Sequence, residues 1–279
     1  AMKAVEDGIN AVKPQGKPDL HAAAASVDVK TGRLLGFYAG QDYLKSQLNW
    51  ALLGGQPGST FKPFALAAGL TDGFSLKDTF AGNSPLVLED GQRIKNEGSG
   101  NGTSYGSKVS LLKATEDSIN TAFVDLTQSM ADDGPQKVVD MAVDLGIPRK
   151  SPGLGPNIGV SLGSATISPI AMANAYASIA NGGMANKWFI VAKVTRGSDG
   201  KVLYEHESKP RRAVDEDIDH DVSYAMQQVV QVGTGRNASA LGRPAAGKTG
   251  TATNASDDVS SSWFVGYTPQ VATAVMYVR

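Results

Sequence analysis

A serine and a lysine three residues apart, Ser59 and Lys62, have the types and spacing for nucleophilic chemistry. At the start of a helix this spacing places both side chains on one face, with Cβ atoms about 5–6 Å apart. The apolar residues after Lys62 would bury its amine, and burial lowers a lysine pKa because it disfavours the ammonium form. The neutral amine could accept the serine proton. The free N–H groups of the helix N-terminus would stabilise negative charge developing beside Ser59.

Ser118 and Asn120 form a second polar pair, at a point where one helical pattern stops and another begins. A loop at such a junction could direct both side chains into one cavity. A hydroxyl there can relay a proton, and an amide can orient a substrate carbonyl. Each pair also has a purely structural interpretation. Ser59 could cap its helix beside a Lys62 amine that reaches solvent, and Ser118 could be a second helix cap.

The triplet Lys-Thr-Gly occurs twice, at residues 30–32 and at residues 248–250. The first copy lies between two strand-like runs, which predicts a hairpin turn. The second copy lies inside a strand-like run, where Lys248 and Gly250 face one side. Gly250 would let a substrate backbone approach closely, and Thr251 beyond it offers a hydroxyl and an N–H to an extended peptide. The second copy is therefore the candidate site.

Other copies of these short motifs lack a supporting context. Ser-x-x-Lys recurs in a predicted hairpin turn and at the start of an exposed helix, where a serine is most often a cap. Ser-x-Asn recurs in a glycine-rich loop. Neither copy of Gly-x-Ser-x-Gly has the preceding strand and immediately following helix that a hydrolase elbow needs. These copies are Ser198/Lys201, Ser110/Lys113, Ser99/Asn101, Ser104 and Ser161.

The composition excludes several other kinds of chemistry. The chain has 279 residues and no cysteine, which excludes thiolate nucleophiles and disulfides, and its three histidines are scattered without metal-ligand spacing. A formal net charge of -1 gives no reason to expect nucleic acid as a partner. No apolar run reaches the roughly 18 residues of a spanning helix, so a membrane anchor would lie outside this sequence. We expect neither a cofactor nor a metal.

Strand-like runs at both ends of the chain, with helical patterns between them, predict an α+β fold. The expected architecture is one antiparallel five-stranded sheet flanked by helices, with a mainly helical subdomain. The expected strands span residues 22–29, 33–40, 247–253, 261–269 and 271–278. The expected helices begin near Ser59, Val109, Pro135, Ser168 and Ile218. A further short helix over residues 2–12 and a linker up to residue 20 precede this domain, and Gly197–Gly200 is expected to turn a hairpin.

Taken in order, the motifs at residues 59–62, 118–120 and 248–250 resemble the set found in penicillin-binding proteins and class A β-lactamases. The surrounding sequence is similar to the transpeptidase domain of class A (bifunctional) high-molecular-weight penicillin-binding proteins, over residues 21–279. The similar stretches are QPGSTFKPF, SINTAF, SLGSATISPIAMANAYASIANGG, AAGKTGTAT and SWFVGYTP. Residues 1–20 resemble the segment that joins such a domain to a membrane-anchored glycosyltransferase domain.

The resemblance implies a serine D,D-transpeptidase that cross-links peptidoglycan stem peptides ending in D-Ala-D-Ala. Ser59 would attack the carbonyl of the penultimate D-alanine, with Lys62 as base. Ser118 and Lys248 would pass a proton to the departing D-alanine, and Asn120 would hold the peptide. The remaining implied roles are carboxylate binding by Thr249 and Thr251, and an oxyanion hole from the N–H groups of Ser59 and Thr251.

The same resemblance implies the partners and the cellular place of the domain. β-Lactam antibiotics would acylate Ser59 and stay, because the ring-opened product does not leave. The domain would work on the extracytoplasmic face of a bacterial cell membrane. The chain departs from the family in ending at VATAVMYVR, where a helix that packs on the sheet is expected, and the Ser-x-Asn region matches the family less closely than the other stretches do.

Three alternatives share part of this pattern. A class A β-lactamase needs a glutamate between the second and third motifs, and none occurs from Asp117 to Tyr204, so slow penicillin turnover is expected. A non-catalytic β-lactam sensor would be acylated without acting on D-Ala-D-Ala mimics. A D,D-carboxypeptidase differs only in using water as the acceptor, and the residues do not separate it from a transpeptidase.

Overall fold

The structure is a computed structural model that describes residues 3, 7, 8, 11, 20–40, 44, 47–254 and 258–279. The helix expected over residues 2–12 rests on Met2, Val5, Ile9 and Val12, which lie outside the described residues, as does most of the linker that follows.

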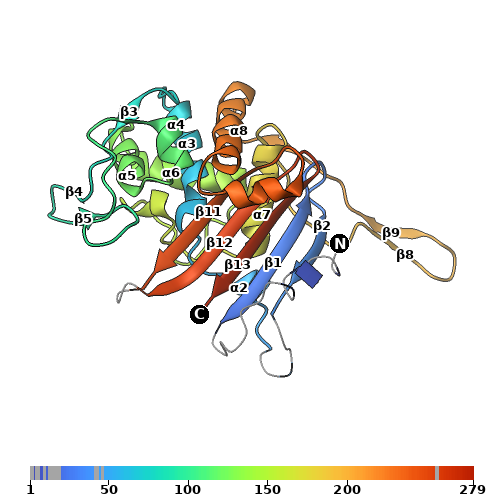
Figure 1. Cartoon of the computed structure of the whole chain (residues 1–279). Helices are drawn as coiled ribbons and strands as arrows, with labels where there is room; N and C mark the ends of the chain where they lie inside the picture. Colours follow the sequence, from blue (N-terminus) through green and yellow to red (C-terminus); the bar gives the residue numbers. More distant parts are fainter. Residues whose placement is uncertain are drawn as a thin grey trace.

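One five-stranded antiparallel sheet joins the two ends of the domain, as the sequence predicts. The strand order is β11-β12-β13-β1-β2, so the first two strands lie beside the last three (Figure 1). The strands are β1 (His21–Asp28), β2 (Leu34–Tyr38), β11 (Ala246–Thr253), β12 (Val259–Tyr267) and β13 (Val271–Val278). Pairing of β1 with β13 joins the first strands of the chain to the last ones, and β11 remains at one edge of the sheet. An edge strand keeps unpaired backbone groups that an extended ligand can use.

The first Lys-Thr-Gly copy forms the turn between β1 and β2, as predicted. Asp28 Oδ1 accepts hydrogen bonds from Thr31 N at 2.9 Å and from Thr31 Oγ1 at 2.6 Å. Gly32 has a φ of 78°, a conformation that glycine adopts without steric cost. The Asp28–Thr31 hydrogen bonds and the positive φ of Gly32 both arise within the turn itself, and they explain why this copy reverses the chain between two strands.

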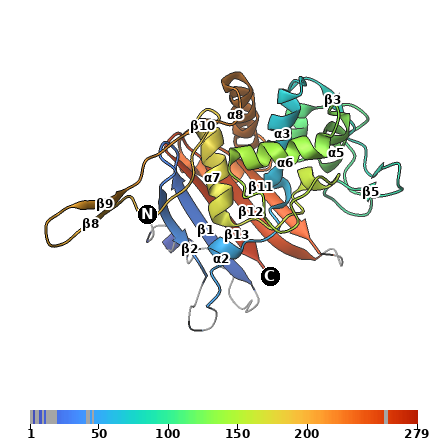
Figure 2. The ribbon, with the colours of Figure 1, turned by 180° about the vertical axis from the view of Figure 1, so that it is seen from behind.

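The inner face of the sheet is covered by helix α7 (Pro169–Ala180), which contacts β1, β12 and β13 (Figure 2). Ser168 caps this helix, since its side chain accepts from Ala171 N at 3.1 Å, and Pro169 fits the first turn because its missing N–H needs no partner there. Residues 169–179 of the helix are all buried. A helix that is buried on every side must lie inside the domain, between the sheet and further helices.

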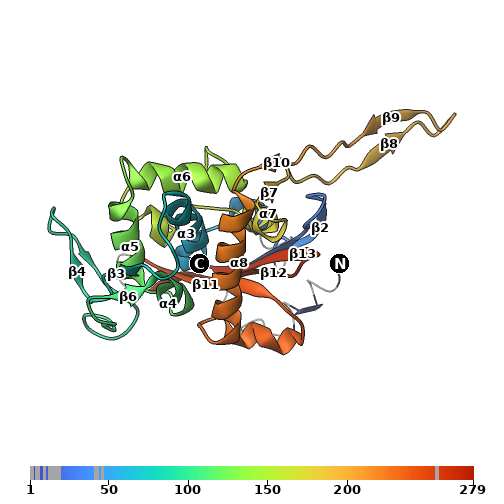
Figure 3. The same cartoon turned by 90° about the horizontal axis from the view of Figure 1, so that it is seen from above.

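The helical subdomain lies beside β11, and α8 (Glu216–Gln231) runs across the top of the sheet (Figures 1 and 3). Helix α6 (Gly134–Leu145) of this subdomain begins beside Pro135 and is closed by Gly146, as predicted. The helix expected from Val109 begins instead at Leu111, because Val109 pairs with Phe80 in a short strand. Besides α7, the described ranges contain the helices α2 (Trp50–Leu53), α3 (Lys62–Thr71), α4 (Leu111–Glu116), α5 (Asn120–Ser129), α6 (Gly134–Leu145) and α8 (Glu216–Gln231), with 3-10 turns η1 (Gly58–Phe61), η2 (Val160–Leu162) and η3 (Arg236–Leu241).

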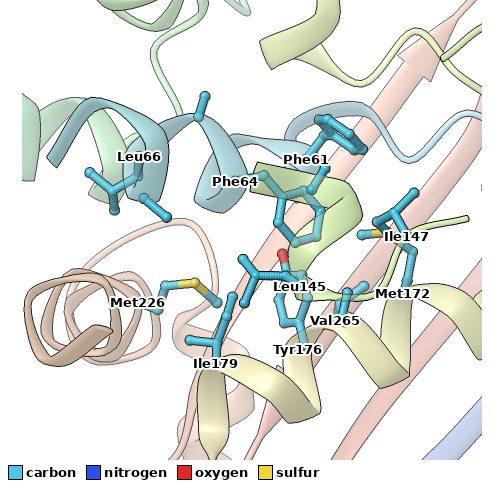
Figure 4. Close-up of a cluster of buried hydrophobic side chains, with 14 of the residues drawn as sticks. Phe61, Phe64, Leu66, Leu145, Ile147, Met172, Tyr176, Ile179, Met226 and Val265 are labelled. Atoms are coloured by element: carbon cyan, nitrogen blue, oxygen red, sulfur yellow. The ribbon is translucent and has the colours of Figure 1, made fainter. Parts of the chain in front are cut away.

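The core between these layers is continuous with the turn that carries Ser59. Figure 4 shows Phe61, Phe64 and Tyr176 pointing toward one another, and both ring pairs are edge-to-face, with centroids 4.8 Å and 6.1 Å apart. The buried Tyr176 hydroxyl donates to Thr60 O at 2.6 Å. Helix α7 therefore fixes the position of the residue next to Ser59.

A hairpin of β8 (Lys193–Thr195) and β9 (Val202–Glu205) projects away from the body, on the side opposite the helical subdomain (Figure 3). Its strands are shorter than the runs that predict them. The remaining strands are two-residue pairs: β3 (Thr79–Phe80), β4 (Leu86–Val87), β5 (Arg93–Ile94), β6 (Val109–Ser110), β7 (Met184–Ala185) and β10 (Arg211–Arg212). Within the described ranges, every helix is too short or too polar to span a bilayer.

Candidate active site

Ser59 lies in the 3-10 turn η1, directly before α3, and is half-buried. The α-helix expected to begin near Ser59 begins at Lys62, and Pro63 occupies its first turn. Proline is tolerated there because the N–H groups of a first turn have no partner within the helix. Ser59 and Lys62 are thus one turn apart at a helix N-terminus.

Lys62 is completely buried, and its amine connects the first motif to the second. Its Nζ donates to Ser118 O at 2.6 Å, to Ser118 Oγ at 3.3 Å and to Asn120 Oδ1 at 2.7 Å. Burial lowers the pKa of Lys62 well below its usual range; the charge of Lys248 lowers this pKa further, and Glu97 raises it. A lysine with a lowered pKa has a larger neutral fraction, and the neutral amine can accept a proton.

Ser118 reaches Lys62 from a strained junction between α4 and α5. Its φ of 62° lies in the left-handed region, which a serine rarely occupies. Asn120 is the first residue of α5, and its Nδ2 donates to Lys95 O at 2.8 Å. Strain of this kind persists where the surrounding structure fixes it, which is common at functional sites.

Lys248 enters the same site from β11 and is also completely buried. Burial lowers its pKa to about 7, and its Nζ lies 3.3 Å from Thr249 O. Its charge also lowers the pKa of Lys62. A group with a pKa near 7 can both give and take a proton at neutral pH.

Two glycines hold the Ser59 turn against β11. A Cβ on Gly250 would lie 2.2 Å from Pro57 O, and a Cβ on Gly58 would lie 2.4 Å from Thr251 O. Any larger side chain at either position would force the backbones apart. The glycine of the third motif is therefore needed for close approach of the protein backbone itself, in addition to the substrate approach that the sequence suggests.

Thr249 and Thr251 lie on β11 next to this contact. Thr249 Oγ1 donates to Thr234 Oγ1 at 2.8 Å, and Thr251 is exposed. Thr249 also borders a largely apolar cavity of about 560 Å³ whose wall includes Leu241 and Phe264. The Thr249 hydroxyl is therefore engaged with the segment after α8, and the Thr251 side chain is open to solvent.

The structure does not join Ser59 to Lys62 directly. Among the described residues no hydrogen bond connects their side chains, and the bonds of Lys62 Nζ go to Ser118 and Asn120. Catalytic hydrogen bonds often tighten only when substrate is bound, so this geometry is compatible with a base at Lys62.

The other copies of these motifs lie outside the candidate site. Ser110 caps α4, since its Oγ accepts from Lys113 N at 3.2 Å. Ser161 is buried, with its Oγ 3.4 Å from Phe123 O. Ser198 lies in the exposed tip of the projecting hairpin.

Several residues of the site have no motif that could reveal them. Thr234 bonds to Thr249, Tyr176 supports Thr60, and Glu97 acts on Lys62. The ring of Phe123 lies 5.4 Å from Lys62 Nζ. Each belongs to a segment distant in sequence from its partner, so spacing gives no signal. In the part of the chain that the structure describes, no group of three His, Asp or Glu side chains could hold a metal ion.

Known proteins are similar to this chain in sequence and in fold. Penicillin-binding protein 1A of Mycolicibacterium smegmatis is 34 % identical over 290 residues, which cover 99 % of this chain and 35 % of that protein. Penicillin-binding protein 1A of Aquifex aeolicus is 32 % identical over 270 residues, which cover 92 % of this chain and 34 % of that protein. The chain thus spans about a third of the length of these relatives.

Solved structures agree with these matches. The penicillin-binding protein PonA1 from Mycobacterium tuberculosis has a TM-score of 0.88 at 30 % identity, over 99 % of this chain and 73 % of that one. The same protein in complex with penicillin V has a TM-score of 0.87 at 30 % identity, over 99 % and 74 % of the two chains. The family model of the penicillin binding protein transpeptidase domain matches residues 22–279, which include all three motifs. Fold, motif order and sequence thus agree, and the chain belongs to the family of penicillin-binding protein transpeptidase domains.

Proposed function

We propose that this chain is a serine D,D-transpeptidase that cross-links peptidoglycan stem peptides through an acyl-enzyme on Ser59. The observation that carries the proposal is the buried amine of Lys62, which contacts Ser118 and Asn120 one helical turn from Ser59. Burial favours the uncharged form of this amine. A serine beside a neutral amine and a second hydroxyl has what acyl transfer needs: a nucleophile, a base and a proton relay.

Acylation starts with attack of Ser59 Oγ on the carbonyl of the penultimate D-alanine of the donor peptide. The hydroxyl proton passes to Lys62 Nζ as the new C–O bond forms. The N–H groups of Ser59 and Thr251 stabilise the oxyanion of the tetrahedral intermediate. The close contact between η1 and β11 supports this role, because it brings the two backbones together.

Collapse of the intermediate breaks the peptide bond and needs a proton on the departing amine. Ser118 and Lys248 supply it, a role that the Lys248 pKa of about 7 supports. Thr249 and Thr251 bind the terminal carboxylate, and Asn120 holds the peptide backbone. The amine of a second stem peptide then attacks the acyl-enzyme and releases Ser59.

β-Lactams would use the same machinery. The structure of PonA1 in complex with penicillin V shows that a relative binds such a drug. In this chain the drug would acylate Ser59, and the opened ring would stay attached and block the approach of an acceptor. The absence of a glutamate from residue 117 to residue 204 supports slow hydrolysis of the adduct.

We propose in addition that residues 21–279 act as one transpeptidase domain and that residues 1–20 connect it to a glycosyltransferase domain. The relatives, about three times as long as this chain, are compatible with such a neighbour. The domain would then act on the extracytoplasmic face of the bacterial membrane, where its substrate lies.

Intact mass after incubation with a fluorescent penicillin, followed by peptide mapping, tests the nucleophile. We expect one adduct, located on Ser59, that is lost in Ser59→Ala and retained in Ser161→Ala. An adduct on another side chain would contradict the proposal.

The reaction is tested with a D-Ala-D-Ala peptide and a thioester analogue in the presence of an added amine. Transfer to the amine supports a transpeptidase. Release to water alone would show a carboxypeptidase, and acylation without any turnover of these substrates would show a sensor. Rapid clearance of nitrocefin would instead indicate a β-lactamase.

A further inference from the structure

Residues 95–97 form a wall of the site next to Asn120. Lys95 O accepts from Asn120 Nδ2 at 2.8 Å, and Asn96 Oδ1 accepts from Thr121 N at 3.0 Å. The segment therefore lies along the first residues of α5, close to the Ser118 hydroxyl that contacts Lys62. Glu97 is the next residue along this wall.

The backbone around Glu97 is held firmly. Asn96 is buried, and its Nδ2 donates to Gly82 O at 3.1 Å and to Thr103 O at 3.0 Å. Glu97 O in turn accepts from Thr103 N at 3.0 Å. These bonds fix the direction of the chain on both sides of Glu97, while its own side chain is exposed.

The carboxylate of Glu97 opposes the positive charge of the site interior. It raises the pKa of Lys62, against the lowering by burial and by Lys248. In the described part of the chain Glu97 takes part in no ion pair, and neighbouring Lys95 directs its Nζ to Gly100 O at 3.1 Å. The negative charge of Glu97 is therefore available to a cation that enters the site.

The second half-reaction brings such a cation. The acceptor binds as an ammonium and first gives one proton to solvent water. Its neutral nitrogen then attacks the ester carbonyl of the Ser59 acyl-enzyme from the place that the first amine left, beside Ser118. A C–N bond forms, the bond to Ser59 Oγ breaks, and the nitrogen carries positive charge until its proton passes through Ser118 and Lys62 to Ser59 Oγ. A carboxylate beside this nitrogen stabilises the transition state of amine attack.

We propose that Glu97 is an acceptor-binding residue, whose carboxylate recruits a primary amine and favours transfer to that amine over hydrolysis. This inference rests on the proposed function, and it names the chemical class of the acceptor: an amine that is cationic in water. Water and alcohols carry no charge before attack, so they gain much less from the carboxylate.

The test is a partition experiment on Glu97→Gln, with a thioester donor and glycinamide or methanol as the acceptor. We expect the ratio of glycinamide product to hydrolysis product to fall about three- to tenfold, the effect of one exposed charge close to the reacting nitrogen. The ratio of methanol product to hydrolysis product should stay at its wild-type value. Glu97→Asp should recover part of the glycinamide ratio. Glu89→Gln, an exposed acid of the β4–β5 turn, should leave both ratios unchanged.

The outcomes separate this inference from the function on which it rests. The amount of each product is divided by the amount of acyl-enzyme, which is measured by intact mass. Thermal melts confirm that each variant is folded. An unchanged glycinamide ratio in Glu97→Gln, or an equal loss with methanol, would overturn the role of Glu97 alone. A wild-type chain that forms no acyl-enzyme would overturn the proposed function.

Discussion

Lys62 and Lys248 illustrate how burial turns an ordinary side chain into a reactive one. Both amines are completely buried, and burial lowers both pKa values. The charge of Lys248 lowers the pKa of Lys62 further, because two nearby ammonium groups repel each other. The hydrogen bonds from Lys62 to Ser118 and Asn120 then decide where this amine points.

Replacement of Lys62 by arginine tests whether a neutral base is needed. A guanidinium cannot lose its proton in a protein, so Lys62→Arg keeps a donor for Asn120 but removes the base. We expect the second-order rate of acylation by fluorescent penicillin to fall on the order of 10³-fold.

Lys113→Arg is the matched control, because Lys113 follows Ser110 at the same spacing but is exposed on α4. It should react at the wild-type rate. A folded Lys62→Arg chain that acylates within a few-fold of wild type would show that Lys62 is not the base.

At the scale of elements, the site depends on the packing of η1 against the edge strand β11. The contact is backbone on backbone, since a Cβ on Gly250 would lie 2.2 Å from Pro57 O. The other side of η1 is held by α7 through Tyr176. The proposed nucleophile is thus fixed between a helix and a strand that are far apart in sequence, and small shifts of either would misplace it.

Gly250→Ala should separate the two elements. We expect a loss of about 1–3 kcal/mol in the free energy of unfolding from overpacking, together with at least a tenfold slower acylation. Thermal unfolding and penicillin labelling measure the two effects.

Gly197→Ala provides the comparison, since a Cβ on Gly197 meets no atom within 4 Å. That variant should match the wild type in both measurements. Unchanged acylation in Gly250→Ala would mean that η1 and β11 need not be in close contact.

At the scale of the whole molecule, the buried lysines oppose folding. The pKa of Lys248 is about 7 in the folded chain and 10.5 ordinarily. Between these pH values the unfolded chain binds a proton that the folded chain lacks, so the contribution of Lys248 to the free energy of unfolding rises with pH. Lys62, whose pKa is also lowered, contributes with the same sign. The core around α3 and α7 must offset this cost.

Lys248→Met should therefore stabilise the domain at neutral pH while preventing catalysis. We expect the free energy of unfolding to rise on the order of a few kcal/mol near pH 7, seen as a melting temperature several degrees higher. This increase should shrink as the pH approaches 10. Thermal unfolding at a series of pH values measures it.

Lys201→Met, at an exposed site, should show no pH-dependent difference from wild type. A constant difference between Lys248→Met and wild type at every pH would contradict the buried-amine interpretation.

The sequence by itself determined the elements and their order. Local signals were enough for this: Ser168 and Pro169 begin α7, Gly146 ends α6, and the alternating runs at both ends of the chain form the sheet. The helix boundary at Val109 was wrong because its pairing with Phe80 is a tertiary contact. Flanking sequence is also the basis on which the three candidate motifs are preferred to the other copies of the same short patterns.

Only the tertiary structure decided how those motifs meet. It brought Lys62 to Ser118 and Asn120, buried Lys248 on β11, and linked Thr234 to Thr249 and Glu97 to Lys62 without any motif. The physical reason is that helix and strand signals act over a few residues. Burial, which sets the pKa of an amine, depends on segments that are distant in the chain and become neighbours only on folding.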